Sequence, residues 1–129
     1  GRIFASGGGL CGSCSVNHPD AEIYTPPYLR MEDGTTPIRP KIVSGPTSVT
    51  IGEDVVIEMD TPDNHTFALI RLSAATHSVN NDQRRIPLDI TIQEGSTFML
   101  KLPVNTNILL PGTYFFFAMN QDGTPSEAI

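Results

Sequence analysis

The chain lacks tryptophan and has little cysteine and little basic charge. Its 129 residues include 8 lysines and arginines against 14 aspartates and glutamates, giving a net charge of −6. Because a domain that neutralises phosphates needs a basic face, this balance argues against a nucleic-acid partner. No apolar run approaches the ~20 residues of a transmembrane helix, so no membrane span is expected. No stretch shows a long helical period, whereas eleven glycines and eleven prolines favour a turn-rich, all-β protein.

Strand-like segments alternate with turn signals from residue 41 onward. Seven short strands at this spacing predict an immunoglobulin-like antiparallel β-sandwich over residues 38–129. The expected strands are 41–44, 48–51, 55–59, 67–72, 86–92, 97–102 and 114–119. Apolar and polar residues alternate along some of these strands, and other strands carry further strongly apolar positions; together these residues predict the core. The core candidates are Val55, Ile57, Met59, Leu69, Ile86, Leu88, Ile90, Ile92, Leu100, Leu102, Phe115 and Phe117.

Residues 1–29 form a smaller, separate part of the predicted architecture. They hold two strand candidates, at 2–5 and 21–24, joined by a loop rich in glycine and cysteine. Two strands alone are marginally stable in water, so we expect them to pair with strands outside the sandwich. The polar segment 30–37, with Asp33-Gly34 and Pro37, is the expected linker.

The only two cysteines, Cys11 and Cys14, are separated by two residues. This spacing occurs in thiol redox motifs, in half of a zinc site and in short-loop disulfides. A structural zinc site needs four ligands and the sequence has no second pair, while a thioredoxin-like motif needs a helix where this chain has loop residues. A structural disulfide is the favoured interpretation, with a thiol redox protein as the weaker alternative.

Asn64 begins the sequon Asn64-His65-Thr66 in a polar turn and is a candidate glycosylation site. Together with a disulfide, it points to an extracellular or secreted protein.

The polar connection 73–88 between two expected strands is unusually rich in side chains with fixed hydrogen-bonding geometry. Asp82, Arg84 and Arg85 are candidates to brace it, because arginine presents a planar fork of donors to carboxylates and carbonyls. We expect the turn of this connection at Asn80–Asp82. Two interpretations of His77 remain open from these residues: a surface histidine on a well-bonded turn, or a metal ligand held at a fixed angle.

Tyr114 follows Pro111-Gly112 at the start of the last expected strand. This position is typical of a tyrosine corner, in which the hydroxyl bonds to nearby backbone.

Several spaced motifs together resemble the C-terminal domain of galactose oxidase and glyoxal oxidase, the copper radical oxidases. The longest is Thr-His-Ser-Val-Asn-Asn-Asp-Gln-Arg-Arg-Ile-Pro-Leu at 76–88. The others are Gly-Arg-Ile-Phe at 1–4, Gly-Leu-Cys-Gly-Ser-Cys at 9–14, Asn17-His18, Ala-Glu-Ile-Tyr-Thr-Pro at 21–26, Arg39-Pro40, Pro-Gly-Thr-Tyr at 111–114 and Thr124-Pro125-Ser126. In that family the histidine of the longest motif is a copper ligand, and the matching position here is His77.

The resemblance implies an early-set (E-set) β-sandwich preceded by two strands of the last blade of a kelch-type β-propeller. It implies copper as the cofactor of the complete enzyme and oxidation of a primary alcohol or aldehyde by O2, giving H2O2. It also implies a Cys11–Cys14 disulfide. The expected partner is a propeller domain, or a separate chain, that packs on the His77 face and on the strands within 1–29.

A copper radical site in this family also uses a tyrosine cross-linked to a cysteine and a second tyrosine followed by a histidine. The chain has no Tyr-His dipeptide, and its Tyr24, Tyr28 and Tyr114 match other family positions. We therefore expect the isolated chain to be inactive and to bind copper weakly, as one part of a longer or split oxidase that is cut at both ends. The alternative is a non-catalytic extracellular module with a structural, assembly or carbohydrate-binding role.

Overall fold

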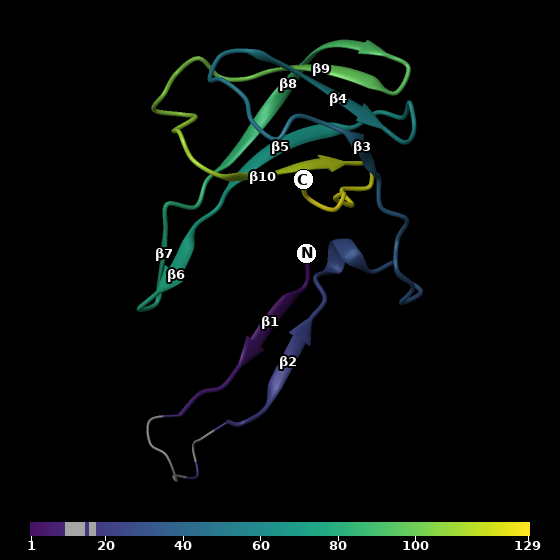
Figure 1. Ribbon diagram of the computed structural model, residues 1–129. Helices are drawn as coiled ribbons and strands as arrows, with labels where there is room; N and C mark the ends of the chain where they lie inside the picture. The colour runs from purple at the N-terminus through teal and green to yellow at the C-terminus, as the bar shows by residue number, and fades with distance from the viewer. Residues whose placement is uncertain (10–14, 16–17) are drawn as a thin grey trace. The chain divides into compact units, whose positions relative to one another are not determined.

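The computed structural model describes residues 1–9, 15 and 18–129. Its elements are almost all β-strands, shown in Figure 1. In chain order they are β1 (Ile3–Ser6), β2 (Ala21–Tyr24), the 3-10 turn η1 (Pro27–Leu29), β3 (Ile42–Ser44), β4 (Asp54–Met59), β5 (Thr66–Arg71), β6 (Ala74–Thr76), β7 (Val79–Asn81), β8 (Arg85–Glu94), β9 (Thr97–Lys101) and β10 (Tyr114–Met119). Among these described residues, no helix has the length and apolar character needed to cross a membrane.

The chain divides into two compact units, Gly1–Pro37 and Ile38–Ile129. The first unit contains an antiparallel hairpin of β1 and β2, in which Ile3 lies opposite Tyr24. Four large apolar side chains of this hairpin are more than half exposed: Ile3, Phe4, Ile23 and Tyr24. The hairpin therefore leaves apolar surface uncovered within its own unit.

The second unit is an antiparallel β-sandwich, as the sequence predicts. Its strands follow the order β10-β5-β8-β9-β4-β3. The long strand β8 joins the two layers, because residues 85–88 pair with β5 and residues 89–94 pair with β9. The layers enclose one hydrophobic core, so the sandwich is stabilised by burial between sheets that share a strand.

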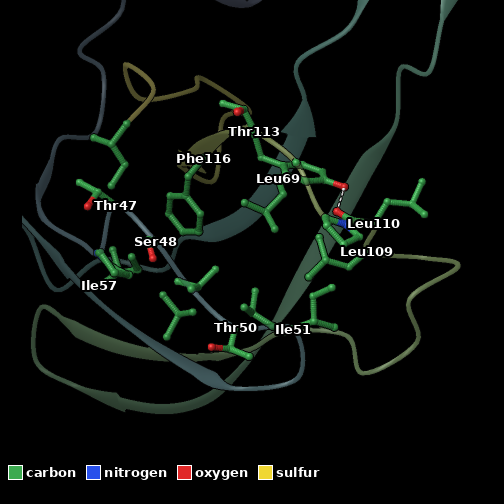
Figure 2. A pocket seen from close by; sticks show the side chains of 18 residues that line it. Thr47, Ser48, Thr50, Ile51, Ile57, Leu69, Leu109, Leu110, Thr113 and Phe116 are labelled. Atoms are coloured by element: carbon green, nitrogen blue, oxygen red, sulfur yellow. Dashed lines mark hydrogen bonds between the residues drawn. The ribbon is translucent and has the colours of Figure 1, made fainter.

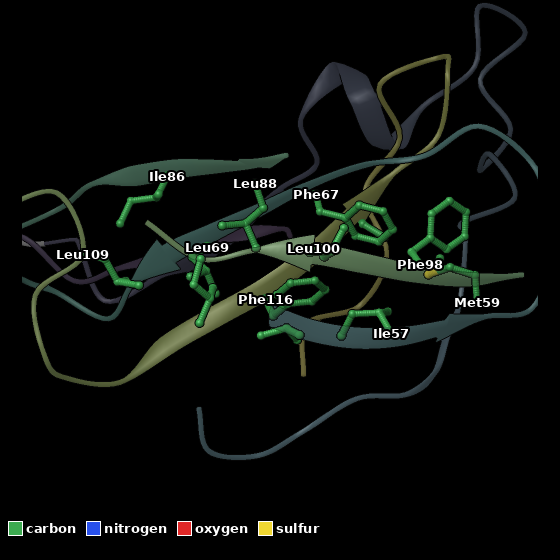
Figure 3. Close-up of a cluster of buried hydrophobic side chains, with 13 residues drawn as sticks. Ile57, Met59, Phe67, Leu69, Ile86, Leu88, Phe98, Leu100, Leu109 and Phe116 are labelled. Atoms are coloured by element: carbon green, nitrogen blue, oxygen red, sulfur yellow. The ribbon is translucent and has the colours of Figure 1, made fainter. Parts of the chain in front are cut away.

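Aromatic rings occupy the centre of that core. Phe67 packs against Phe98 and Phe116, with ring centroids 5.2 and 5.8 Å apart. Figure 3 shows these rings surrounded by aliphatic side chains from both layers. The buried residues of this cluster are Val55, Ile57, Met59, Phe67, Leu69, Ile86, Leu88, Phe98, Leu100, Leu102, Leu109, Phe116 and Ala118.

The prediction for β10 placed the wrong phenylalanines in the core. Phe116 is buried, whereas Phe115 is exposed and Phe117 is only half-buried. The register explains this result, because Phe116 lies opposite the buried Leu69 while Phe115 lies opposite Ile70. Phe115 and Phe117 instead meet on the outer face, with centroids 6.3 Å apart.

Two other local predictions were wrong. Residues 48–51 form no strand and instead line a cleft together with Pro46. Pro46 lacks the N–H donor that a strand in a sheet needs. Ile90 and Ile92 are exposed although Ile86 and Leu88 are buried. The ladder shifts register between Ile90 and Ile92, so β8 does not carry one inward face along its whole length.

Candidate metal-ligand site on the hairpin arm

A short two-stranded arm, defined as β6 and β7 with the turn between them, interrupts the connection from β5 to β8 (Figure 1). Ala74 pairs with Asn81, Ala75 with Asn80 and Thr76 with Val79. This register leaves a two-residue turn at His77–Ser78. The prediction of a turn at Asn80–Asp82 is therefore wrong, because Asn80 and Asn81 belong to β7.

His77 occupies the tip of the arm and is exposed to solvent. Its backbone φ is 52° and that of Ser78 is 62°. Positive φ at both central residues suits a two-residue hairpin, but glycine or asparagine adopts it at lower cost. Such unfavourable conformations cluster at ligand sites, so a histidine at this position is a functional candidate.

The base of the arm is tied to the sandwich by hydrogen bonds from its backbone. The amide of Arg71 donates to the carbonyl of Arg84 at 3.0 Å, and the amide of Leu72 donates to the carbonyl of Thr113 at 3.0 Å. These bonds join both sides of the arm to each other and to the loop that precedes β10.

Side chains add further bonds at the base. Arg84 donates through Nη1 to the carbonyls of Asn107 and Ile108 at 3.0 and 2.9 Å. The carboxylate of Asp82 accepts from Arg71. Arg85 lies in β8 opposite Ile70, and its side chain is exposed.

The sequence predictions missed the contact between Arg71 and Asp82. Arg71 lies at the end of a strand, eleven residues from Asp82, and only the pairing of the arm brings the two together. The sequence did carry one signal for this contact: a single arginine ends an apolar strand, and the segment that follows contains an aspartate.

The arm offers one metal-ligating side chain rather than a complete site. Imidazole nitrogen is a suitable donor for copper. Over residues 1–9, 15 and 18–129, no group of three or more histidine, cysteine, aspartate or glutamate side chains could hold a metal ion. The chemistry of His77 therefore suits one ligand of a copper site, and such a site would need further ligands from outside the described residues.

A cleft in the sandwich is largely apolar and is formed by a different part of the chain from the arm. It has a volume of about 570 Å³ and lies between the segment 46–51, the loop before β10 and the core (Figure 2). Tyr114 is the only ionisable side chain among its lining residues, and its hydroxyl donates to the carbonyl of Leu110 at 2.8 Å. This bond is the predicted tyrosine corner.

The two other predicted sites lie elsewhere in the chain. Cys11 and Cys14 fall outside the described residues. Asn64 is exposed in the connection between β4 and β5. The next residue, His65, is buried with its ring edge-on to Phe67 and Phe98, which anchors the sequon to the core.

Comparison with known proteins gives consistent matches over this chain. Residues 39–129 match the family model of the galactose oxidase-like early set domain. Two proteins named galactose oxidase, from Gibberella zeae and from its strain PH-1, are each 45% identical over 129 residues, which are 99% of this chain and 19% of each relative. A solved structure of a fungal alcohol oxidase of the AA5 family, in complex with copper, is 43% identical with a TM-score of 0.89, and the match covers 99% of this chain and 27% of that one. The chain thus spans about a fifth of the length of these curated relatives.

Proposed function

Because the chain belongs to the galactose oxidase-like early set domain family, we propose that it is the C-terminal sandwich of a copper radical oxidase and that it supplies His77 as one copper ligand. The observation that carries this proposal is the placement of His77 at an exposed hairpin tip, in a backbone conformation that costs free energy for a residue with a side chain. A copper ligand supplied by the sandwich must project towards a site formed outside it, and the tip of the hairpin provides that projection.

The residues at the base of the arm fix the direction of the His77 ring. Metal-binding histidines depend on surrounding hydrogen bonds for their orientation. Asp82 and Arg84 act here through bonds to Arg71 and to loop carbonyls, and Arg85 is a third bracing candidate. Copper, when bound, supplies the one-electron redox chemistry.

The partner of the sandwich is a propeller domain, or a separate chain, that covers the His77 tip and pairs with the hairpin of β1 and β2. The exposed Ile3, Phe4, Ile23 and Tyr24 support this part of the proposal, because a hairpin with apolar residues on both faces is marginally stable until it is covered. In this arrangement, β1 and β2 complete the last blade of a kelch-type propeller.

The reaction of the complete enzyme is oxidation of a primary alcohol or aldehyde by O2 to give H2O2. Its substrate-binding groups and remaining copper ligands belong to the partner domain. The isolated chain should therefore release no H2O2 and bind copper weakly, since one imidazole does not make a tight site.

We place the protein outside the cell, with Cys11 and Cys14 joined as a disulfide and a glycan on Asn64. Exposure of Asn64 supports glycosylation. Mass spectrometry of protein from a secreting host, before and after glycosidase and with or without reduction, measures both modifications. An unmodified Asn64 or two free thiols would contradict the corresponding assignment.

The decisive experiment replaces His77 by alanine in the complete protein. Copper content and H2O2 release should both be lost, while the circular dichroism spectrum stays unchanged because no core side chain is removed. His18→Ala is the matched control, since His18 is also exposed and lies in the other unit. Full activity in His77→Ala would contradict the ligand role.

If the unmodified complete protein binds no copper and oxidises no alcohol, the oxidase proposal fails as a whole. That result would favour the non-catalytic extracellular module with a structural, assembly or carbohydrate-binding role.

A further inference from the structure

We propose that Arg71 positions His77 by clamping Asp82 at the base of the arm. The functional meaning of this inference rests on the proposed ligand role of His77, whereas the clamp is a property of this chain alone. Arg71 is the last residue of β5, and Asp82 is the first residue after β7. The pair therefore joins the end of a core strand to the returning side of the arm.

The contact between the two side chains is close and partly shielded from water. Nη1 of Arg71 lies 2.7 Å from Oδ2 of Asp82 and 2.8 Å from Oδ1. The Arg71 side chain is only 19% exposed, although that of Asp82 is 46% exposed. Hydrogen bonds between ionised partners are short and strong, and partial burial of the cation reduces their screening by salt.

The other side of the guanidinium packs on the loop before β10. Gly112 has a φ of +152°, and a Cβ built on it would lie 3.4 Å from Nη2 of Arg71 and 3.5 Å from Nε. These are ordinary van der Waals distances, so the guanidinium lies directly against this loop, beside the bond from the Leu72 amide to the Thr113 carbonyl, and the positive φ is what favours glycine there. Arg71 therefore links three segments: β5, the arm and this loop.

The arm needs such a clamp because its own strands contribute little stability. β6 and β7 have three residues each, and the side chains of β7 are all exposed. A two-stranded ribbon of this kind is marginal in water. Asp82 also has a φ of 65°, so a contact that holds it must offset an unfavourable backbone conformation.

Small movements at the base are enlarged at the tip. A strand of three residues is about 10 Å long. A rotation of about 10° at the base would therefore move His77 by roughly 2 Å, and a displacement of ~1 Å in a reacting group can lower a rate about 100-fold. Arg71 acts at the base, where a small change in angle has its largest effect on the position of the ligand.

The test measures amide hydrogen exchange in the 129-residue chain by NMR. Arg71→Met should speed exchange of the β6 and β7 amides about three- to tenfold, while the β5 amides keep their rates. Asp82→Asn, which keeps the shape of the side chain and its tolerance of positive φ, should have the same effect. The double variant should exchange no faster than Arg71→Met alone, because Asp82→Asn removes an interaction that Arg71→Met has already removed.

The matched control is Lys101→Met, which removes a cation from another ion pair. Lys101 Nζ lies 3.1 Å from Asp54 Oδ1 on β9 and β4, and the arm amides should not respond to its loss. Unchanged arm exchange in Arg71→Met, additive effects in the double variant, or an equal response to Lys101→Met would each overturn the proposal.

A second measurement separates the clamp from the oxidase proposal. In the complete protein, Arg71→Met should retain copper, because the His77 imidazole remains, but its copper EPR spectrum should broaden as the ligand samples several angles. A loosened arm in a complete protein that binds no copper would contradict the oxidase proposal and support the clamp. A complete protein that binds copper, and whose arm is equally rigid with and without Arg71, would support the oxidase proposal and contradict the clamp.

Discussion

Replacing Phe116 by alanine tests the packing of the sandwich at the position where sequence and structure disagree. Phe116 is 8% exposed and stacks on Phe67. A phenylalanine buries about 150 Å² or more, and at about 25 cal/mol per Å² its removal loses roughly 3.5 kcal/mol of transfer free energy. Measured losses for such truncations are about 3–5 kcal/mol once the cavity is included.

The position of Phe116 places the expected value at the lower end of that range. Its ring also lines the open cleft of Figure 2, so the space left by truncation is continuous with solvent and is not a sealed void. We expect the free energy of unfolding to fall by about 3 kcal/mol. Because small domains have only about 5–15 kcal/mol in total, this is a large fraction of the stability of the sandwich.

Phe115→Ala is the matched control, since it removes the same side chain one residue away. Phe115 is 44% exposed and contacts Phe117 on the outer face, so we expect a loss of about 1–2 kcal/mol. Urea unfolding followed by circular dichroism suits a chain without tryptophan. With an m-value of about 1–2 kcal/mol per M, Phe116→Ala should lower the midpoint by roughly 1.5–3 M. An equal or larger loss in Phe115→Ala would refute the assigned face of β10.

Two further predictions concern single hydrogen bonds. Tyr114→Phe removes the donor to the Leu110 carbonyl and should lower the free energy of unfolding by about 0.5–1.5 kcal/mol in the same urea assay; an unchanged midpoint would show that the corner contributes nothing. The Thr35 hydroxyl donates to Asp33 at 2.6 Å and, with the Thr35 amide, holds the pKa of Asp33 below its usual value. Thr35→Val should raise that pKa in an NMR titration. A carboxyl pKa that is lower in the folded state stabilises the protein at pH values above the unfolded pKa. This stabilisation by Asp33 should disappear as the pH falls through its pKa in the folded state, and Thr35→Val should lose less stability over the same pH range. An unchanged pKa would contradict this cause.

Much of the sandwich could be predicted because its strands follow a simple alternation. Val55, Ile57 and Met59 are buried in β4 as expected, and β10 has the predicted bounds. Alternation gives two possible faces, however, and does not say which one meets the core. In β10, both faces carry aromatic residues, so the choice of Phe116 depended on the register with β5.

The sequence alone indicated the antiparallel β architecture and the tyrosine corner, and its resemblance to the copper radical oxidases made His77 the candidate ligand. These depend on local patterns: alternation along a strand, turn residues between strands, and a motif of adjacent residues. Only the tertiary structure decided where the turn of the arm lies and which side chain braces Asp82. The physical reason is that both depend on pairing between distant segments. His77 reaches the tip because β6 pairs with β7, and Arg71 meets Asp82 because that pairing returns the chain to the end of β5.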